Sequence, residues 1–167
     1  MDRSDLEREL ERLHPESFGW ALFCSGRDRD LAQDVLQEAY ARVVSGSARF
    51  QGRSAFRTWL FGVIRHTALA ERRRAWRPGA LPVEAALADP APGADERIEE
   101  AERREELVLA LTALSPRQRE VLVLVFYHEL TVEEAARVME VSLGSARTHY
   151  DRGKKGLLAR LSQEVRR

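Results

Sequence analysis

The sequence predicts an all-α protein of two small helical domains joined by a flexible linker, the second containing a helix-turn-helix. Apolar residues recur at steps of three and four along most of the 167-residue chain. No stretch alternates apolar and polar residues, as a half-buried strand would. Four prolines and two glycines gather between residues 78 and 95, which predicts a linker.

The composition is typical of a soluble globular protein, with 44% hydrophobic and 32% charged residues. No apolar run approaches the roughly 20 residues that a membrane-spanning helix needs. The N-terminus, MDRSDLERELERL, is charged throughout and is unlike a signal peptide. Cys24 is the single cysteine, which excludes an internal disulfide and a CxxC metal site. These features predict a cytoplasmic protein without a metal or cofactor.

The charge is unevenly distributed although the formal net charge is zero. Residues 143–167 hold seven bases and two acids, for a net charge of +5. Residues 78–106 hold nine acids and three bases, for a net charge of −6. Basic ends around an acidic middle are what separated DNA-contacting surfaces would produce.

The first domain is expected to contain several helices. Apolar residues between Leu6 and Cys24 predict two helical pieces broken near Pro15. Asp30 is expected to cap the next helix, with Gln33 as its capping-box partner, and Gly46 to end it. One face of that helix is apolar. The opposite face carries Asp34, Gln37, Glu38 and Arg42, and on helical pattern alone it is expected to be solvated.

A helix rich in aromatic and basic residues follows, with Ser54 as its expected cap. Phe56 and Trp59 lie near its start, and it ends in an arginine run at residues 72–77. The aromatic residues are either core or a surface on which unpaired bases stack while arginines bind the phosphates.

The second domain is expected to begin with a helix from about Arg97 through Leu114. Ser115, followed by proline and by Gln118 three residues on, predicts the start of the next helix. That helix carries apolar residues as far as Phe126.

Residues 131–161 predict two helices joined by a short turn. Thr131 and Glu134 form a capping box, and Ser142 is a good cap for the second helix. The second helix is expected to bury Ala146, Tyr150, Leu157 and Leu161 and to expose Arg147, Thr148, Arg152, Lys154 and Lys155. An ordinary helical hairpin remains an alternative, but the basic cluster and the cap spacing favour a helix that enters the major groove of DNA.

Three segments carry a resemblance to a known family: DVLQEAYARV, RFQGRSAFRTWLFGVIRHTALAERRR and LSPRQREVLVLVFYHELTVEEAARVMEVSLGSARTHYDRGKKGL. They resemble the two domains of an extracytoplasmic-function bacterial sigma factor, the promoter-specificity subunit of RNA polymerase. The resemblance covers most of the chain from about Leu6, except the linker. It implies an N-terminal domain at 1–77, a linker at 78–97 and a C-terminal domain at 98–167.

The resemblance also implies three binding surfaces. The polar face at Asp34, Gln37 and Glu38 would dock on the clamp helices of the largest polymerase subunit. The −10 promoter element, where a base is flipped out, would contact Phe56, Trp59, Arg65, His66, Arg72 and Arg73. The −35 element would contact Ser145, Arg147, Thr148, Arg152, Lys154 and Lys155. The side at Leu122, Val125 and Phe126 would either face the polymerase flap or lie in the domain core.

Several residues depart from the family pattern. His66 stands where asparagine is common, which predicts an altered base preference. Glu129 and Glu140 stand where the turns often have glycine, so differently shaped turns are expected. Asp151 would pair with Arg147 or accept from a cytosine amine. Gly153 and Gly156 are expected to soften the recognition helix.

Three other functions are compatible with parts of this sequence. A stand-alone helix-turn-helix regulator would bind a palindrome as a dimer, but would leave the aromatic and basic first domain unexplained. A sigma-like decoy would bind regulatory proteins only. An enzyme is the weakest option, because the four histidines lie on different elements and form no nucleophile or zinc pattern with Cys24. Family members are commonly held inactive by an anti-sigma factor, which is the implied regulatory partner.

Overall fold

The computed structural model describes residues 2–75 and 106–164, and all regular structure in these two ranges is helical. The predicted linker at 78–97 and the expected helix start near Arg97 lie outside the described residues. The chain divides into two compact units. None of the described helices is long and apolar enough to cross a membrane. The all-α prediction with two helical units is confirmed.

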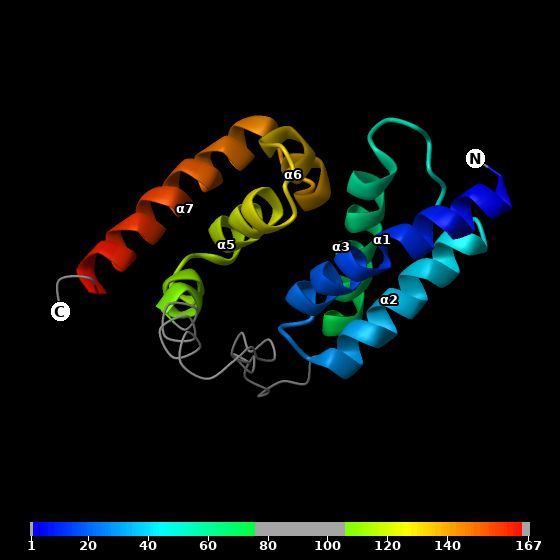
Figure 1. The fold of residues 1–167 in the computed structure, drawn as a ribbon, viewed down its shortest axis with the longest axis horizontal. Coiled ribbons are helices and arrows are strands. Elements are labelled where there is room, and N and C mark those ends of the chain that lie inside the picture. The colour runs from blue at the N-terminus through cyan, green and yellow to red at the C-terminus, as the bar shows by residue number, and fades with distance from the viewer. Residues whose placement is uncertain (1, 76–105, 165–167) are drawn as a thin grey trace. The chain divides into compact units, whose positions relative to one another are not determined.

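The N-terminal unit consists of three helices that contact one another pairwise (Figure 1). They are α1 (Arg3–Cys24), α2 (Arg29–Val44) and α3 (Phe56–Ala75). Trp20 lies at the centre of the core and is fully buried. Its indole Nε1 donates to the carbonyl oxygen of Phe61 at 3.0 Å. Its ring stacks on those of Phe61 and Phe23, with centroids 5.8 and 5.3 Å away. One side chain therefore joins α1 to α3.

The predicted break in the first helix is wrong, because α1 continues through Pro15. An interior proline costs a helix about 3 kcal/mol through the lost hydrogen bond and the clash with the preceding turn. The buried residues of α1 lie on both sides of the proline, Leu10 and Leu13 before it and Trp20 and Ala21 after it. Packing of this continuous face against α2 and α3 outweighs the local penalty.

Two predicted caps are displaced in the N-terminal unit. Asp28, rather than Asp30, caps α2, because its Oδ1 accepts from the backbone N–H of Leu31 at 3.0 Å. Asp30 lies in the first turn, where a carboxylate still stabilises the positive end of the helix. The first helical residue of α3 is Phe56, so Ser54 stands too early to cap it; its hydroxyl donates to the carbonyl of Ala55 at 3.2 Å.

The C-terminal unit begins with helical residues 106–112 and continues through four further elements. These are α5 (Pro116–Leu122), a π-helical turn at Val123–Tyr127, α6 (Val132–Met139) and α7 (Leu143–Glu164). Ser115 caps α5 as predicted, with its side chain accepting from the N–H of Gln118. Arg119 donates to the carbonyls of Leu111, Thr112 and Leu114 at 3.0, 2.8 and 3.3 Å. It thereby adds donors to carbonyls at the end of the preceding helix, where the helix itself supplies few. Of these carbonyls, Leu111 O also accepts from the N–H of Leu114 at 3.1 Å.

Two glycines in α7 allow a close approach to α5 and to Leu114, which precedes α5. A Cβ atom added at Gly153 would lie 3.2 Å from Leu122 Cδ1 and 3.3 Å from the carbonyl oxygen of Gln118. A Cβ at Gly156 would lie 2.8 Å from Leu114 Cδ2. The sequence-based interpretation of these glycines missed the packing, because it considered only helix propensity.

Gly153→Val should destabilise the C-terminal unit by about 1–3 kcal/mol, since the added methyl groups would overlap α5. The measurement is urea unfolding followed by circular dichroism. Gly62→Val is the matched control, because a Cβ there meets no atom within 4 Å. Equal losses of stability in the two variants would show that helix propensity, and not packing, sets the effect.

Candidate nucleic-acid interface

The predicted helix-turn-helix is formed by α6, a short turn and α7 (Figure 1). Glu134 Oε2 accepts from the N–H of Thr131 at 2.9 Å, and Thr131 Oγ1 accepts from the N–H of Glu134 at 3.1 Å. These two bonds are the predicted capping box. Ser142 Oγ accepts from the N–H of Ser145 at 3.1 Å and caps α7 as predicted. The local caps therefore fix where both helices begin.

The turn between α6 and α7 has the shape that glycine usually provides. Glu140 adopts φ +55°, and Glu129 adopts φ +53° in the preceding turn. The N–H of Val141 donates to Ala136 O at 3.1 Å, and the N–H of Glu140 donates to Arg137 O at 3.3 Å. This is a Schellman motif. The expectation of differently shaped turns is wrong, because these hydrogen bonds offset the strain of a left-handed glutamate.

Glu140→Gly is expected to raise the free energy of unfolding by about 1 kcal/mol, since glycine adopts positive φ without a steric penalty. Thermal and urea denaturation measure the change. Lys155→Gly is a control of opposite sign, because residue 155 is exposed in the interior of α7, where glycine costs about 1 kcal/mol. A destabilised Glu140→Gly variant would contradict the account of this turn.

The exposed side of α7 carries most of the residues predicted to bind DNA. Five of them are exposed: Ser145, Arg147, Thr148, Arg152 and Lys155. Lys154 is partly buried, with its ammonium nitrogen 4.2 Å from the centroid of the Tyr150 ring. Among the interactions of the described residues, Arg152 and Lys155 form no ion pair, and both are therefore available for an anionic ligand.

Two acids pair with bases of this face. Asp151 Oδ1 lies 3.8 Å from Lys154 Nζ, and Glu133 Oε1 lies 3.2 Å from Arg147 Nη2. The sequence suggested that Asp151 pairs with Arg147. In the structure Asp151 pairs with Lys154 instead, and Arg147 pairs with Glu133. Glu133 was missed as a partner, because no sequence pattern links residues 14 positions apart on two different helices.

Thr148 is oriented by its own helix. Its hydroxyl donates to the carbonyl of Gly144 at 3.0 Å. The apolar side of α7 is only partly as predicted: Ala146 is fully buried, whereas Tyr150, Leu157 and Leu161 are half-buried. Tyr150 stacks on Phe126, with ring centroids 6.0 Å apart. Three apolar residues were expected to lie either in the domain core or against the polymerase flap. Of these, Leu122 is buried, Val125 is half-buried and Phe126 is 62% exposed.

The polar side of α2 forms one exposed face in the N-terminal unit. Asp34, Gln37 and Glu38 are all exposed, while Val35 and Ala39 on the other side of the helix are fully buried. Glu38 Oε1 accepts from Arg42 Nε at 2.8 Å. The structure therefore brings together the three residues predicted to dock on a partner.

The aromatic residues at the start of α3 pack on one another. Phe50, Phe56 and Trp59 form a triangle with every pair of ring centroids 5.4 Å apart, and all three are half-buried. Phe50 was missed as a member of this cluster, because it precedes the helix and no periodicity marks it. The cluster presents partly accessible ring surface beside α3.

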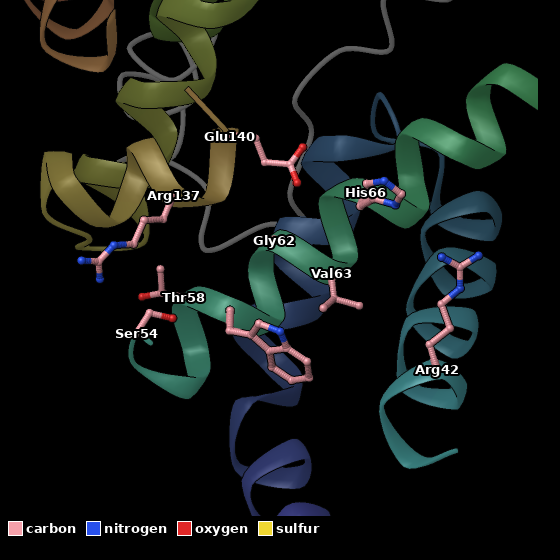
Figure 2. Close-up of a pocket in the computed structure, with 9 residues that line it drawn as sticks. Arg42, Ser54, Thr58, Gly62, Val63, His66, Arg137 and Glu140 are labelled. Atoms are coloured by element: carbon pink, nitrogen blue, oxygen red, sulfur yellow. The ribbon is translucent and has the colours of Figure 1, made fainter. Parts of the chain in front are cut away.

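The remaining predicted residues of α3 differ in accessibility. His66 is exposed and follows Gly62 and Thr58 at successive turns of α3 (Figure 2). Arg72 and Arg73 are also exposed. Arg65 is only 7% exposed, so the structure does not support it as a ligand for DNA. An exposed histidine and two exposed arginines leave α3 a surface suited to a nucleic-acid strand.

The two units match two known sequence families. Residues 10–78 match Sigma-70 region 2, and residues 104–157 match Sigma-70 region 4. The ECF RNA polymerase sigma factor SigX of Bacillus subtilis (strain 168) is 30% identical over 142 residues, which cover 81% of this chain and 73% of SigX. The ECF RNA polymerase sigma factor SigC of Mycobacterium tuberculosis is 29% identical over 140 residues, covering 84% and 75% of the two chains.

The fold is also similar to that of a solved sigma factor. RpoE of Bartonella quintana, crystallised with the anti-sigma factor NepR, superposes with a TM-score of 0.75 at 23% identity, covering 95% of this chain and 97% of that chain. The order of the two matched regions and the identity to SigX lead to one conclusion. The chain belongs to the ECF RNA polymerase sigma factors, proteins that associate with RNA polymerase and promoter DNA in transcription initiation.

Proposed function

We propose that this sigma factor selects promoters through two separate DNA-binding surfaces and a third surface that binds core polymerase. The single observation that carries the proposal is the capped helix-turn-helix, whose α7 exposes Arg147, Arg152 and Lys155 on one side. The assigned domains are 1–77 for core polymerase and the −10 element, and 98–167 for the −35 element, with 78–97 as linker. The protein performs no catalysis of its own and acts in the cytoplasm.

The −35 element is read by the N-terminal half of α7. In a helix-turn-helix the first turns of the recognition helix meet the base edges in the major groove. Arg147 and Thr148 occupy those turns, while Arg152 and Lys155 lie further along for phosphate contacts. An arginine that bonds a guanine with two N–H groups adds about 1–3 kcal/mol of discrimination.

The −10 element is bound by α3. Trp59 and Phe56 offer partly exposed rings on which an unpaired base can stack, and Arg72 and Arg73 supply charge for the phosphates. His66 is exposed on the same helix, with both a donor and an acceptor nitrogen available to a flipped base. Arg65 is left out of this surface because it is buried.

Core polymerase is bound through the exposed face of α2. Asp34 and Glu38 give this face its negative charge, with Gln37 between them. A complementary basic partner would gain charge-assisted hydrogen bonds there. The clamp helices of the largest subunit are the proposed site.

An anti-sigma factor is the proposed regulator. RpoE of Bartonella quintana was solved with such a partner, and its fold is similar. In the C-terminal unit Phe126 and Tyr127 are 62% and 71% exposed. Large aromatic side chains at the surface favour contact with another protein, either the polymerase flap or an anti-sigma factor.

Binding to core polymerase tests the proposal directly. Asp34→Lys should weaken binding of the full chain to purified core polymerase at least tenfold, as measured by fluorescence anisotropy. Glu11→Lys, at an exposed position of α1, is the control for the same charge change. No binding by the unaltered protein would instead favour a stand-alone regulator. Equal effects of the two variants would move the docking surface away from α2.

A further inference from the structure

The two helices of the helix-turn-helix are joined by one exposed ion pair. Glu133, the second residue of α6, places Oε1 3.2 Å from Nη2 of Arg147, the fifth residue of α7. The neighbouring Glu134 is engaged in the capping box with Thr131, so the two adjacent glutamates perform different tasks. Because caps fix both helix starts, the backbone positions that carry Glu133 and Arg147 are held at a defined separation.

This pair is poorly explained by stability or by affinity alone. Its side chains are 62% and 52% exposed, and exposed pairs add little to folding stability. A carboxylate at the start of α6 also repels the phosphates that bind a helix-turn-helix, which lowers the general affinity for DNA. A carboxylate in the first turn of α6 stabilises the positive end of that helix, but this contribution does not depend on the contact with Arg147. The contact itself therefore points to a further role of Glu133.

We propose that Glu133 is a positioning residue that aims Arg147 at a base edge and thereby sets sequence discrimination. The inference rests on the proposed function of Arg147 in reading the −35 element. A guanidinium has five N–H donors, so a bond from Nη2 to Glu133 leaves donors on the other nitrogens for a guanine. Holding the guanidinium in place before binding reduces the ordering cost of the specific contact. Glu133 thus lowers the affinity for DNA of any sequence and raises the discrimination between bases at the position that Arg147 contacts.

Two substitutions of Glu133 separate its charge from its hydrogen bond. Glu133→Ala removes both, whereas Glu133→Gln removes the charge and keeps an oxygen acceptor for Arg147. The assay is binding of holoenzyme, reconstituted with the full chain, to duplexes that carry each base at every upstream position, and to random duplex. Asp151→Asn is the control, because Asp151 is an exposed acid of α7 that pairs with Lys154.

Both Glu133 variants are expected to bind random duplex roughly two- to fivefold more tightly, as the removal of an exposed charge would give. Glu133→Ala should lose about two- to fivefold of discrimination at one base position, the same position that Arg147→Ala relaxes. Glu133→Gln should keep most of that discrimination. In an Arg147→Ala background, Glu133→Ala should change discrimination no further.

The outcomes distinguish the inference from the function on which it rests. Unchanged or sharper discrimination in Glu133→Ala would overturn the inference and make Glu133 a competitor of DNA for Arg147. Loss of discrimination that persists in the Arg147→Ala background would overturn it as well. If Arg147→Ala relaxes no position, then the proposed function of Arg147 fails, whatever Glu133 does.

Discussion

Trp20→Ala is expected to lower the free energy of unfolding of the N-terminal unit by about 3–5 kcal/mol. The side chain is fully buried, stacks on Phe23 and Phe61, and donates to the carbonyl of Phe61 from α1. Alanine would leave a cavity and a buried carbonyl without this donor. Since small domains are stable by only about 5–15 kcal/mol, this substitution would remove a large share of the unit's stability.

Urea unfolding monitored by far-ultraviolet circular dichroism measures this loss. Trp20→Phe should fall between alanine and the original residue, because it restores ring volume without the N–H donor. Leu158→Ala is the control, since Leu158 is 65% exposed in the C-terminal unit. A Trp20→Ala variant as stable as the Leu158 control would show that the three-helix core is assembled differently.

Removing two bases of α7, Arg152 and Lys155, should flatten the salt dependence of promoter binding. Each phosphate neutralised contributes about −0.9 to the slope of log affinity against log salt concentration. The double variant Arg152→Ala, Lys155→Ala should therefore reduce the magnitude of that slope by about 1.8 for the reconstituted holoenzyme. Affinity for cognate and random duplexes should fall together, because phosphate contacts carry no base information.

Lys154→Ala is the matched control on the same helix. Its ammonium lies over the Tyr150 ring and beside Asp151, so less of its charge is available for a phosphate. We expect a smaller change of slope than either Arg152→Ala or Lys155→Ala produces alone. If Lys154→Ala changed the slope of log affinity against log salt concentration more than Arg152→Ala does, the DNA would lie on another side of α7.

Local interactions explain why the helix-turn-helix could be predicted from the sequence. The capping box at Thr131 and the cap at Ser142 involve residues three positions apart, so their pattern is visible in a single stretch. The exposed face of α2 was predicted for the same reason, because helical periodicity alone separates Asp34 from Val35.

Tertiary interactions explain what the sequence could not predict. The helix through Pro15 depends on burial against two other helices, which outweighs a local rule. Helix propensity alone predicts that Gly153 makes the helix flexible, whereas the structure shows that it packs closely against α5. The pair of Glu133 with Arg147 and the burial of Arg65 arise from packing that no spacing reveals. Glu140 adopts the positive φ that is usual for glycine, because backbone hydrogen bonds of the turn stabilise this conformation.

The most direct test of promoter selection is run-off transcription with purified bacterial core polymerase and this protein on a library of random upstream sequences. We expect selective initiation that yields two sequence elements. Arg147→Ala should relax only the upstream element and His66→Ala only the downstream one. Initiation without sequence preference, or both variants relaxing the same element, would contradict the two-surface account. No initiation despite core binding would point to a decoy that serves regulatory proteins.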